Sequence, residues 1–319
     1  GYMVLMQAIS LGELVSFFTY IVMVAWPMRQ VGRTLSEMGM ALVAMDRIQD
    51  ILKAKEEVNE SNGEVIETLQ TIEFNDVWFK FPLEEEYALR GLSIKIHNGE
   101  TLVILGPTGS GKSTMMKLLL RFYEPEKGQI LLNGKDIKTY NKRLLRQKMG
   151  LVLQDAFLFT ESLAGNIAYA QKRANHRDIL EVAAWSSLLE VENVFSDGYE
   201  TMVGEKGVTL SGGQKQRVSL ARTLLQNPDI LILDDVTSAL DTATEANILK
   251  ELKQRWSAKT TLIISHRLTV VPYADRIVIL ENGRLQAQGS HEQVMEQSTF
   301  YQQIHDIQNV LESEIEELD

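Results

Sequence analysis

The residues from Gly106 to Ser113 read G-P-T-G-S-G-K-S, a spacing that can hold the phosphate groups of a nucleotide. Glycines let backbone N–H groups turn towards an anion, and a helix that begins at such a loop adds the positive end of its dipole. We expect Lys112 to bind the β- and γ-phosphates and the Ser113 hydroxyl to bind Mg²⁺. A flexible glycine turn is the alternative, but an apolar run precedes the loop and a helical pattern follows it, as a phosphate loop requires. The predicted phosphate-binding residues are Gly106, Thr108, Gly109, Ser110, Gly111, Lys112, Ser113 and Thr114.

The elements that would position this loop are the strands and helices of an α/β fold. The runs 149–153, 230–233 and 261–264 are continuously apolar, which is typical of strands buried on both faces of a parallel sheet. Helical stretches separate these runs, so the core is predicted to be an α/β sheet. Two further strands are expected at 71–81 and 92–96.

Turn signals and helical periodicity divide the rest of this region. Between Gln154 and Ser211 the patterns are mostly helical, as in residues 177–189, and they predict an inserted helical subdomain at about 155–220. Asparagine–glycine pairs predict hairpin turns, because both residues accept positive φ angles. The three pairs are Asn98-Gly99, Asn133-Gly134 and Asn282-Gly283.

Composition argues against several classes of protein. The chain has 319 residues, 45% of them hydrophobic, which is enough for one large or two smaller domains with real cores and argues against disorder. The net charge of −11 and the pI of about 5.1 make nucleic acid a poor partner, because its phosphate backbone would be repelled. With no cysteine there are no disulfides or thiolate metal sites, and five scattered histidines offer no His/carboxylate metal cluster.

The first 53 residues have the pattern of a membrane helix and its extension into water. Residues 1–28 carry a single charge, and Arg29 and Arg33 follow at once, as where a span leaves the bilayer on the cytoplasmic side. The second apolar run, 14–28, is shorter than the about twenty residues of a complete span, so a buried core helix is the alternative. We expect a turn, a last span ending near Arg29, and an amphipathic helix over 36–53 that continues it. The start within apolar sequence suggests a piece of a longer polypeptide.

Two polar segments flank the predicted soluble domain, residues 71–298. Residues 54–70 are charged and contain Ser61-Asn62-Gly63, a composition typical of a linker. Residues 299–319 predict an acidic, solvated C-terminal helix, and a helix that docks on a partner subunit is the alternative. The apolar stripe of this helix consists of Ile304, Ile307, Leu311, Ile315 and Leu318.

The stretch Leu210-Ser211-Gly212-Gly213-Gln214 resembles the signature motif of the nucleotide-binding domains of ABC transporters. Further motifs stand in that family's order: Gln154 resembles the Q-loop, 230–234 the Walker B strand, 238–241 the D-loop and His266 the switch histidine. Each alone has a plainer explanation, such as a helix cap for Asp241 or a buried core histidine for His266, but their joint occurrence favours the family. Val203-Gly204-Glu205 resembles a stretch found in exporters, and residues 1–53 resemble the last membrane helix of exporter half-transporters.

The resemblance implies a P-loop NTPase domain of the ABC type, with an antiparallel β subdomain and a helical subdomain, that uses ATP and Mg²⁺. In the family, two domains close head to tail on two ATP molecules, and each site combines one chain's phosphate loop with the other chain's signature. Phe81 matches the place of the aromatic residue that stacks on adenine, and Tyr87 is the second choice. The implied residues are Lys112, Gln154, Asp235 and His266 for catalysis, Ser113, Gln154 and Asp234 for Mg²⁺, and Ser211, Gly212, Gly213, Gln214 and Asp241 for nucleotide.

One residue departs from the family pattern. The family's catalytic base after the Walker B aspartate is glutamate, and this chain has Asp235, which is one methylene shorter. A misplacement of about 1 Å can cost roughly 10²-fold in rate, so we expect this chain's own site to bind ATP and hydrolyse it slowly. Because the signature is intact, we predict a heterodimer whose partner supplies the glutamate. A homodimer in which the backbone shifts and Asp235 serves as the base is the alternative.

These features predict the ATP-binding and hydrolysing half of an ABC exporter. We expect a multi-pass protein of a bacterial plasma membrane, with its nucleotide-binding domain in the cytoplasm, that moves an amphipathic drug or lipid together with a second half-transporter. A soluble ABC-type ATPase acting on nucleic acid or ribosomes is disfavoured by residues 1–33 and by the acidic charge. A regulatory subunit that never hydrolyses ATP is favoured by Asp235 and disfavoured by His266.

Overall fold

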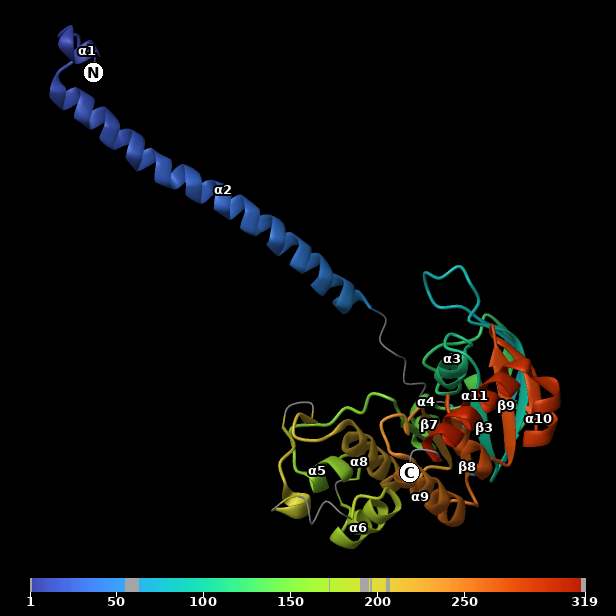
Figure 1. Ribbon diagram of the computed structural model, residues 1–319. Helices are drawn as coiled ribbons and strands as arrows, with labels where there is room; N and C mark the ends of the chain where they lie inside the picture. Colours follow the sequence, from blue (N-terminus) through green and yellow to red (C-terminus); the bar gives the residue numbers. More distant parts are fainter. Residues whose placement is uncertain are drawn as a thin grey trace. The chain divides into compact units, whose positions relative to one another are not determined.

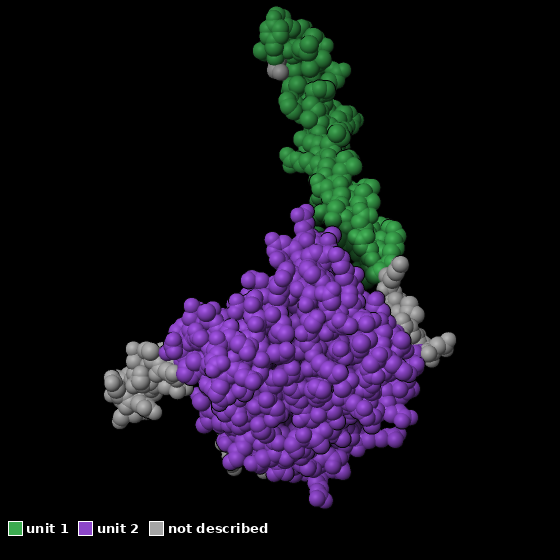
Figure 2. Space-filling view, turned by 90° about the vertical axis from the view of Figure 1, so that its right-hand side faces the viewer, with its two compact units in different colours: residues 1–58 green, residues 59–319 purple. Residues whose placement is uncertain are grey.

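The structure is a computed structural model of the chain. It describes residues 2–54, 63–171, 173–189, 195, 197–204 and 207–316, with side chains up to residue 308. The chain divides into two compact units, Gly1–Val58 and Asn59–Asp319, which Figure 2 draws in separate colours.

The first unit is dominated by one long helix. After the short α1 (Tyr2–Leu5), α2 runs from Leu11 to Lys53, and a capping box between Ser10 and Glu13 starts it. Its 43 residues correspond to about 65 Å at 1.5 Å per residue. By length and composition, α2 is the one helix among the described residues that is long and apolar enough to cross a bilayer. The prediction that the amphipathic segment continues the apolar one is confirmed, since α2 passes through Pro27 without ending.

The second unit is built around a six-stranded sheet in the order β10-β9-β3-β8-β7-β6. Figure 1 labels its four central strands, β9, β3, β8 and β7. All neighbours in it are parallel except β9 and β10, which form an antiparallel pair. The three apolar runs predicted to be buried parallel strands are β6, β7 and β8, so that prediction is confirmed. The strands are β3 (Thr101–Leu105), β6 (Met149–Val152), β7 (Ile230–Asp234), β8 (Thr260–Ile264), β9 (Arg276–Glu281) and β10 (Arg284–Gly289).

A separate four-stranded antiparallel sheet has the order β2-β1-β4-β5. Asn133-Gly134 turns β4 into β5 and Asn282-Gly283 turns β9 into β10, as predicted. The hairpin predicted at Asn98-Gly99 is wrong, because this pair leads from β2 in one sheet to β3 in the other. The strands of the second sheet are β1 (Thr71–Phe79), β2 (Leu89–His97), β4 (Lys127–Leu132) and β5 (Lys135–Asp136).

The two faces of the central sheet bury two different cores. Successive strand residues point to opposite faces, and in β3 Leu102 and Ile104 belong to the core shared with the four-stranded sheet and α3. Val103 and Leu105 belong to the core shared with α6, α8 and α9. The helices are α3 (Lys112–Leu119), α4 (Lys142–Gln147), α5 (Leu163–Ile167), α6 (His176–Trp185), α8 (Gly212–Leu225), α9 (Thr242–Arg255), α10 (His291–Gln297) and α11 (Thr299–Glu316), with 3₁₀ turns η1 (Ile137–Thr139), η2 (Gly198–Glu200) and η4 (Leu268–Tyr273).

The segments flanking the domain are partly packed on it. Of the predicted linker 54–70, residues 55–62 lie outside the described residues, while Ile66 and Leu69 are buried in the core below the four-stranded sheet. In the predicted solvated helix, Tyr301 is fully buried and Ile307 is 60% exposed, so α11 is anchored at its first turn. The side chains of the rest of the apolar stripe, from Leu311 onwards, lie outside the described ones.

Asn166 organises the helical subdomain. It is fully buried at the C-terminal end of α5, and its Nδ2 donates to three backbone carbonyls of residues 159–162 at 3.0–3.3 Å. Its Oδ1 accepts hydrogen bonds from the backbone N–H of Phe159 at 2.9 Å and from the Arg222 guanidinium at 2.8 Å. Because Arg222 lies on α8, one amide side chain ties the segment before α5 to α8.

Replacing Asn166 by alanine is expected to destabilise the second unit by about 3 kcal/mol or more, because several buried backbone groups and the Arg222 guanidinium lose partners at once. Urea unfolding measures the loss, and limited proteolysis within residues 157–167 locates it. The matched control is Asn175→Ala, which removes an exposed N-cap of α6 and should cost about 1 kcal/mol. Equal losses for the two variants would contradict the role given to Asn166.

Candidate nucleotide-binding site

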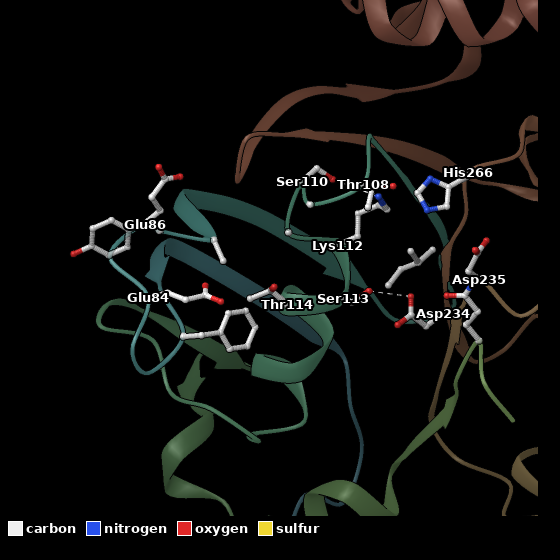
Figure 3. Close-up of a pocket in the computed structure, with 17 residues that line it drawn as sticks. Glu84, Glu86, Thr108, Ser110, Lys112, Ser113, Thr114, Asp234, Asp235 and His266 are labelled. Atoms are coloured by element: carbon white, nitrogen blue, oxygen red, sulfur yellow. Dashed lines mark hydrogen bonds between the residues drawn. The ribbon is translucent and has the colours of Figure 1, made fainter. Parts of the chain in front are cut away.

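The site lies where three central strands end. The parallel register aligns Ile104 of β3 with Ile264 of β8, and Ile264 in turn with Asp234 of β7. The residues that follow these strands therefore emerge at one edge of the sheet, the usual place for ligands in an open α/β sheet. A pocket of about 470 Å³ opens there (Figure 3). It is lined by Phe81, Glu84, Glu86, Tyr87, Ala88, Thr108, Gly109, Ser110, Gly111, Lys112, Ser113, Thr114, Gln154, Asp234, Asp235, Ile264 and His266.

The loop between β3 and α3 has the geometry expected of a phosphate cradle. Gly111 is the N-cap of α3 with φ of 100°, so α3 starts at the loop and points its N-terminus into the pocket edge. A Cβ on Gly111 would lie 2.7 Å from the carbonyl oxygen of Ala88, and one on Gly106 would lie 2.0 Å from that of Leu280. Neither position has room for a side chain, which explains two of the three glycines of the motif.

Lys112 is held inside this loop. It is 6% exposed, and its Nζ donates to the carbonyls of Gly106 at 2.7 Å and Pro107 at 2.9 Å. Burial lowers the pKa of Lys112, while the charges of Asp234 and Asp235 act to raise it. A buried ammonium group that is this close to the loop's backbone is placed to meet an anion entering the cradle.

Asp234 and Ser113 offer oxygen atoms side by side. The Ser113 hydroxyl donates to Asp234 Oδ1 at 3.2 Å, from the first turn of α3 to the end of β7. Burial raises the pKa of Asp234, and the carboxylate of Asp235 adds to this, while the hydrogen bond from Ser113 and the charge of Lys112 oppose it. A hydroxyl and a partly buried carboxylate beside an open pocket fit the oxygen ligands that Mg²⁺ prefers.

Asp235, Gln154 and His266 reach the same pocket from three different segments. In Figure 3, Asp235, Asp234 and His266 lie on one side of the cradle, and Glu84 and Glu86 lie on the other. His266 is exposed, so the alternative of a buried core histidine is excluded. Asp235 has a φ of 51°, and its N–H donates to the carbonyl of Ile264 at 2.9 Å.

Both aromatic candidates for stacking on adenine, Phe81 and Tyr87, line the pocket. The Phe81 ring packs edge-on against Phe79 and Tyr123, with centroids 5.0 and 5.2 Å apart, and Lys117 Nζ lies 5.3 Å from its centroid. Tyr87 packs edge-on against Trp78 at 5.4 Å. The structure therefore brings both rings within the site.

The signature and D-loop residues lie apart from this pocket. Ser211 caps α8 through a capping box with Gln214, and Gly212 is exposed at the start of the helix. Asp241 caps α9 by accepting from the Thr244 N–H at 2.9 Å, a bond that lowers the pKa of Asp241. Among the described residues of one chain, these groups therefore do not contribute to the cradle. Glu205 of the exporter-like stretch lies outside the described residues.

Sequence reasoning missed several residues of the site. Glu84, Glu86, Ala88 and Ile264 line the pocket without belonging to any motif. Gln216 is 4% exposed, and its Nε2 donates to the backbone carbonyl of Gln154 at 3.1 Å, which ties α8 to the segment after β6. The only signal for Gln216 was its place two residues after the signature.

Comparisons with known proteins agree with this geometry. Residues 89–238 match the family model described as ABC transporter. An uncharacterized ABC transporter ATP-binding protein of Bacillus subtilis (strain 168) is 37% identical over 310 residues, covering 97% of this chain and 53% of that protein. An ATP-dependent lipid A-core flippase of Alkalilimnicola ehrlichii is 37% identical over 306 residues, covering 96% of this chain and 52% of the flippase.

A solved structure of a bacterial Atm1-family ABC exporter with ATP bound superposes with a TM-score of 0.78 at 35% identity. It covers 94% of this chain, and this chain covers 53% of it. The chain thus spans about half the length of the relatives it matches. Together with the phosphate cradle and the strand order, these matches identify the chain as carrying an ABC transporter ATP-binding domain of the exporter type.

Proposed function

We propose that this chain binds and hydrolyses ATP and couples that reaction to export of a substrate across a membrane. The single observation that carries the proposal is the pocket at the ends of β3, β7 and β8, which gathers the phosphate cradle, Gln154, Asp234, Asp235 and His266. A phosphate loop with its lysine, an oxygen pair for Mg²⁺ and a separate carboxylate are the parts that hydrolysis of a nucleoside triphosphate uses.

We expect ATP to occupy the pocket with its triphosphate at one end and its adenine at the other. The triphosphate would lie along the loop 106–114, where backbone N–H groups, the α3 N-terminus and Lys112 would bind its oxygens. The adenine stacks on the Phe81 face at the other end, and Tyr87 takes this place if Phe81 does not. Phe81 is partly exposed, so its ring is accessible for stacking, and this supports Phe81 as the first candidate.

Ser113 and Asp234 would hold Mg²⁺, with Gln154 completing the set from the segment after β6. When bound, the ion neutralises charge on the β- and γ-phosphates. Burial raises the pKa of Asp234, so a bound cation would stabilise its charged form, and this supports the assignment.

Hydrolysis requires water to attack the γ-phosphorus while the bond to the ADP oxygen breaks. Asp235 would accept the proton of that water, and His266 would hold the γ-phosphate in line from the segment after β8. Lys112 stabilises the charge that moves onto the ADP oxygens. Because the Asp235 side chain is short, we expect the water to be held loosely and the step to be slow.

A second ATP-binding domain would complete the site. The N-terminus of α8, with the Ser211 hydroxyl and the backbone N–H groups of Gly212 and Gly213, would be a second anion site outside the lining of this chain's own pocket. It would close on the γ-phosphate held by a partner. An intact signature beside an altered base favours a heterodimer in which the partner supplies glutamate at the place of Asp235.

The transport half of the proposal rests on α2 and on the relatives. α2 would be the last membrane helix, with 36–53 extending into the cytoplasm of a bacterial cell. One relative is named as a lipid A-core flippase and another, 37% identical, as a putative multidrug export protein of Bacillus subtilis. We therefore expect an amphipathic lipid or drug as the substrate.

Lys112→Ala is expected to weaken ATP binding by about 100-fold or more, because a buried charged hydrogen-bond donor to phosphate is lost. Equilibrium binding of a fluorescent ATP analogue measures this. Lys138→Ala, which removes an exposed lysine paired with Glu124 on the surface, is the matched control and should bind normally. Equal affinity of both variants would exclude the cradle as the ATP site.

Asp235→Glu is expected to raise the ATPase rate by about 10- to 100-fold if the partner is held constant, since the added methylene moves the carboxylate to the attacking water. The measurement is the steady-state ATPase rate of the membrane-embedded complex. High activity of this chain alone, abolished by Asp235→Ala, would instead make Asp235 a working base and favour the homodimer.

Removing Mg²⁺ with excess EDTA should abolish hydrolysis, and Ser113→Ala should raise the Mg²⁺ concentration for half-maximal rate by about tenfold, because one of the oxygen ligands is lost. A Mg²⁺ titration at saturating ATP gives the value. Thr139→Ala serves as the control, because it removes an exposed hydroxyl that does not line the pocket. An unchanged midpoint for Ser113→Ala would remove Ser113 from the ligand set.

A further inference from the structure

We propose that Arg267 is a positioning residue that clamps the backbone of residues 236–241 and thereby links this chain's own ATP site to its signature. The inference rests on the proposed function for its kinetic consequence, but the clamp itself is visible in the contacts of the fold. The role of the segment it holds is to connect two regions that serve different ATP molecules.

The guanidinium of Arg267 bonds to three backbone carbonyls of one short segment. Its Nη2 donates to Ser238 O at 2.9 Å, and its Nη1 lies 3.4 Å from the carbonyl oxygens of Thr237 and Leu240. The planar fork of arginine suits several acceptors at once, which an ammonium group would not match. Arg267 follows His266 directly, so the histidine and the clamped segment share one anchor.

A buried carboxylate fixes the other side of Arg267. Glu245, in the first turn of α9, is 1% exposed, and its Oε2 lies 3.9 Å from Arg267 Nη1. The Thr269 hydroxyl donates to the same oxygen at 2.7 Å, while Glu245 Oε1 has no hydrogen-bond partner among the described residues. A buried carboxylate with this little hydrogen bonding depends on the nearby positive charge, so Arg267 and Glu245 hold each other in place.

The clamped segment touches the ATP pocket at its first end. The Ser238 hydroxyl donates to the carbonyl of Asp235 at 2.9 Å, so holding Ser238 also holds the backbone of the residue we assign as the base. Asp235 is fixed from the other direction by its N–H bond to Ile264. Arg267 thus acts on Asp235 through one intervening residue.

The second end of the segment packs under the signature. A Cβ on Gly213 would lie 2.9 Å from the carbonyl oxygen of Ala239 and 3.1 Å from Leu240 Cδ2, and one on Gly212 would lie 3.6 Å from the Ala239 Cβ. The segment and the start of α8 are therefore in direct contact. Any shift of 236–241 displaces Asp235 on one side and the signature glycines on the other.

Two arguments separate this clamp from ordinary packing. First, the backbone carbonyls of residues 237, 238 and 240 all accept hydrogen bonds from one side chain, whereas carbonyls in an exposed turn can bond to water instead. Second, the carboxyl group of Glu245 is buried, at 1% exposure, with the Arg267 guanidinium 3.9 Å from it, so the two side chains meet at the edge of the core.

Hydrogen–deuterium exchange of the full-length protein tests the clamp without any assumption about ATP. Arg267→Ala should speed exchange of peptides covering 236–241 by about tenfold or more, since charged hydrogen bonds that hold the segment are lost, and should leave peptides covering 106–113 within about twofold. Arg267→Lys keeps the charge beside Glu245 but not the planar guanidinium. Its exchange rate in 236–241 should therefore lie between those of the wild-type protein and Arg267→Ala. Arg284→Ala, an exposed arginine of β10, is the matched control.

The kinetic arm uses the same variants in the membrane-embedded complex. Arg267→Ala should lower kcat by about tenfold or more with less than about a twofold change in ATP affinity, because the cradle is untouched while Asp235 and the signature lose their shared support. Arg267→Lys should restore part of the rate. Glu245→Gln keeps the acceptor for Thr269 and removes the charge, and it should give an intermediate loss.

The outcomes are distinct. Faster exchange confined to 236–241 together with a fall in kcat at constant ATP affinity supports the proposal. Exchange and kcat equal to those of Arg284→Ala overturn it, and so does faster exchange throughout the domain with no recovery in Arg267→Lys, which would mean a general structural role. A wild-type protein that binds no ATP would overturn the proposed function instead, and the exchange experiment would still decide the clamp.

Discussion

A buried ammonium group sets the conditions for the whole site. Lys112 is almost fully enclosed, and a charge removed from water must be compensated by nearby partners. The carbonyls of Gly106 and Pro107 supply two acceptors, and Asp234 and Asp235 supply negative charge from the C-terminal end of β7. This compensation is incomplete, since burial still lowers the pKa of Lys112. An entering phosphate would provide the missing negative charge.

The strand order of the domain determines where the groups that compensate the charge of Lys112 are placed. For two carboxylates to meet Lys112, β7 must end beside the loop that follows β3, and β8 lies between these two strands in the sheet. The apolar residues of β3, β7 and β8 fill both faces of the sheet and leave only the strand ends polar. Burial on both faces keeps the strands in register, and this register places residues 106, 235 and 265 at one edge.

The sequence was informative where chemistry and local pattern coincide. The phosphate cradle, the buried strands β6 to β8 and the continuation of the apolar helix in α2 were predictable, because each depends on residues close together in the chain. The pairing of strands was not, since Asn98-Gly99 has a hairpin composition and yet joins two sheets. Burial of Ile66 and Leu69 in a charged segment, and the Gln216 bond to Gln154, also depend on contacts between distant residues. Period and composition carry no information about such contacts.

The same long-range contacts bear on the shortened side chain at 235. A backbone shift that brought the aspartate towards the attacking water would have to break its N–H bond to Ile264 and the bond from the Ser238 hydroxyl to its carbonyl. Ser238 is itself held by Arg267, and Arg267 by the buried Glu245, so the shift would disturb a connected chain of contacts. The φ of 51° at Asp235 already lies in a region that a non-glycine residue occupies at a cost. A backbone fixed this firmly cannot move to compensate for the missing methylene, so the carboxylate stays farther from the attacking water. This is why we favour a slow site over a rearranged one.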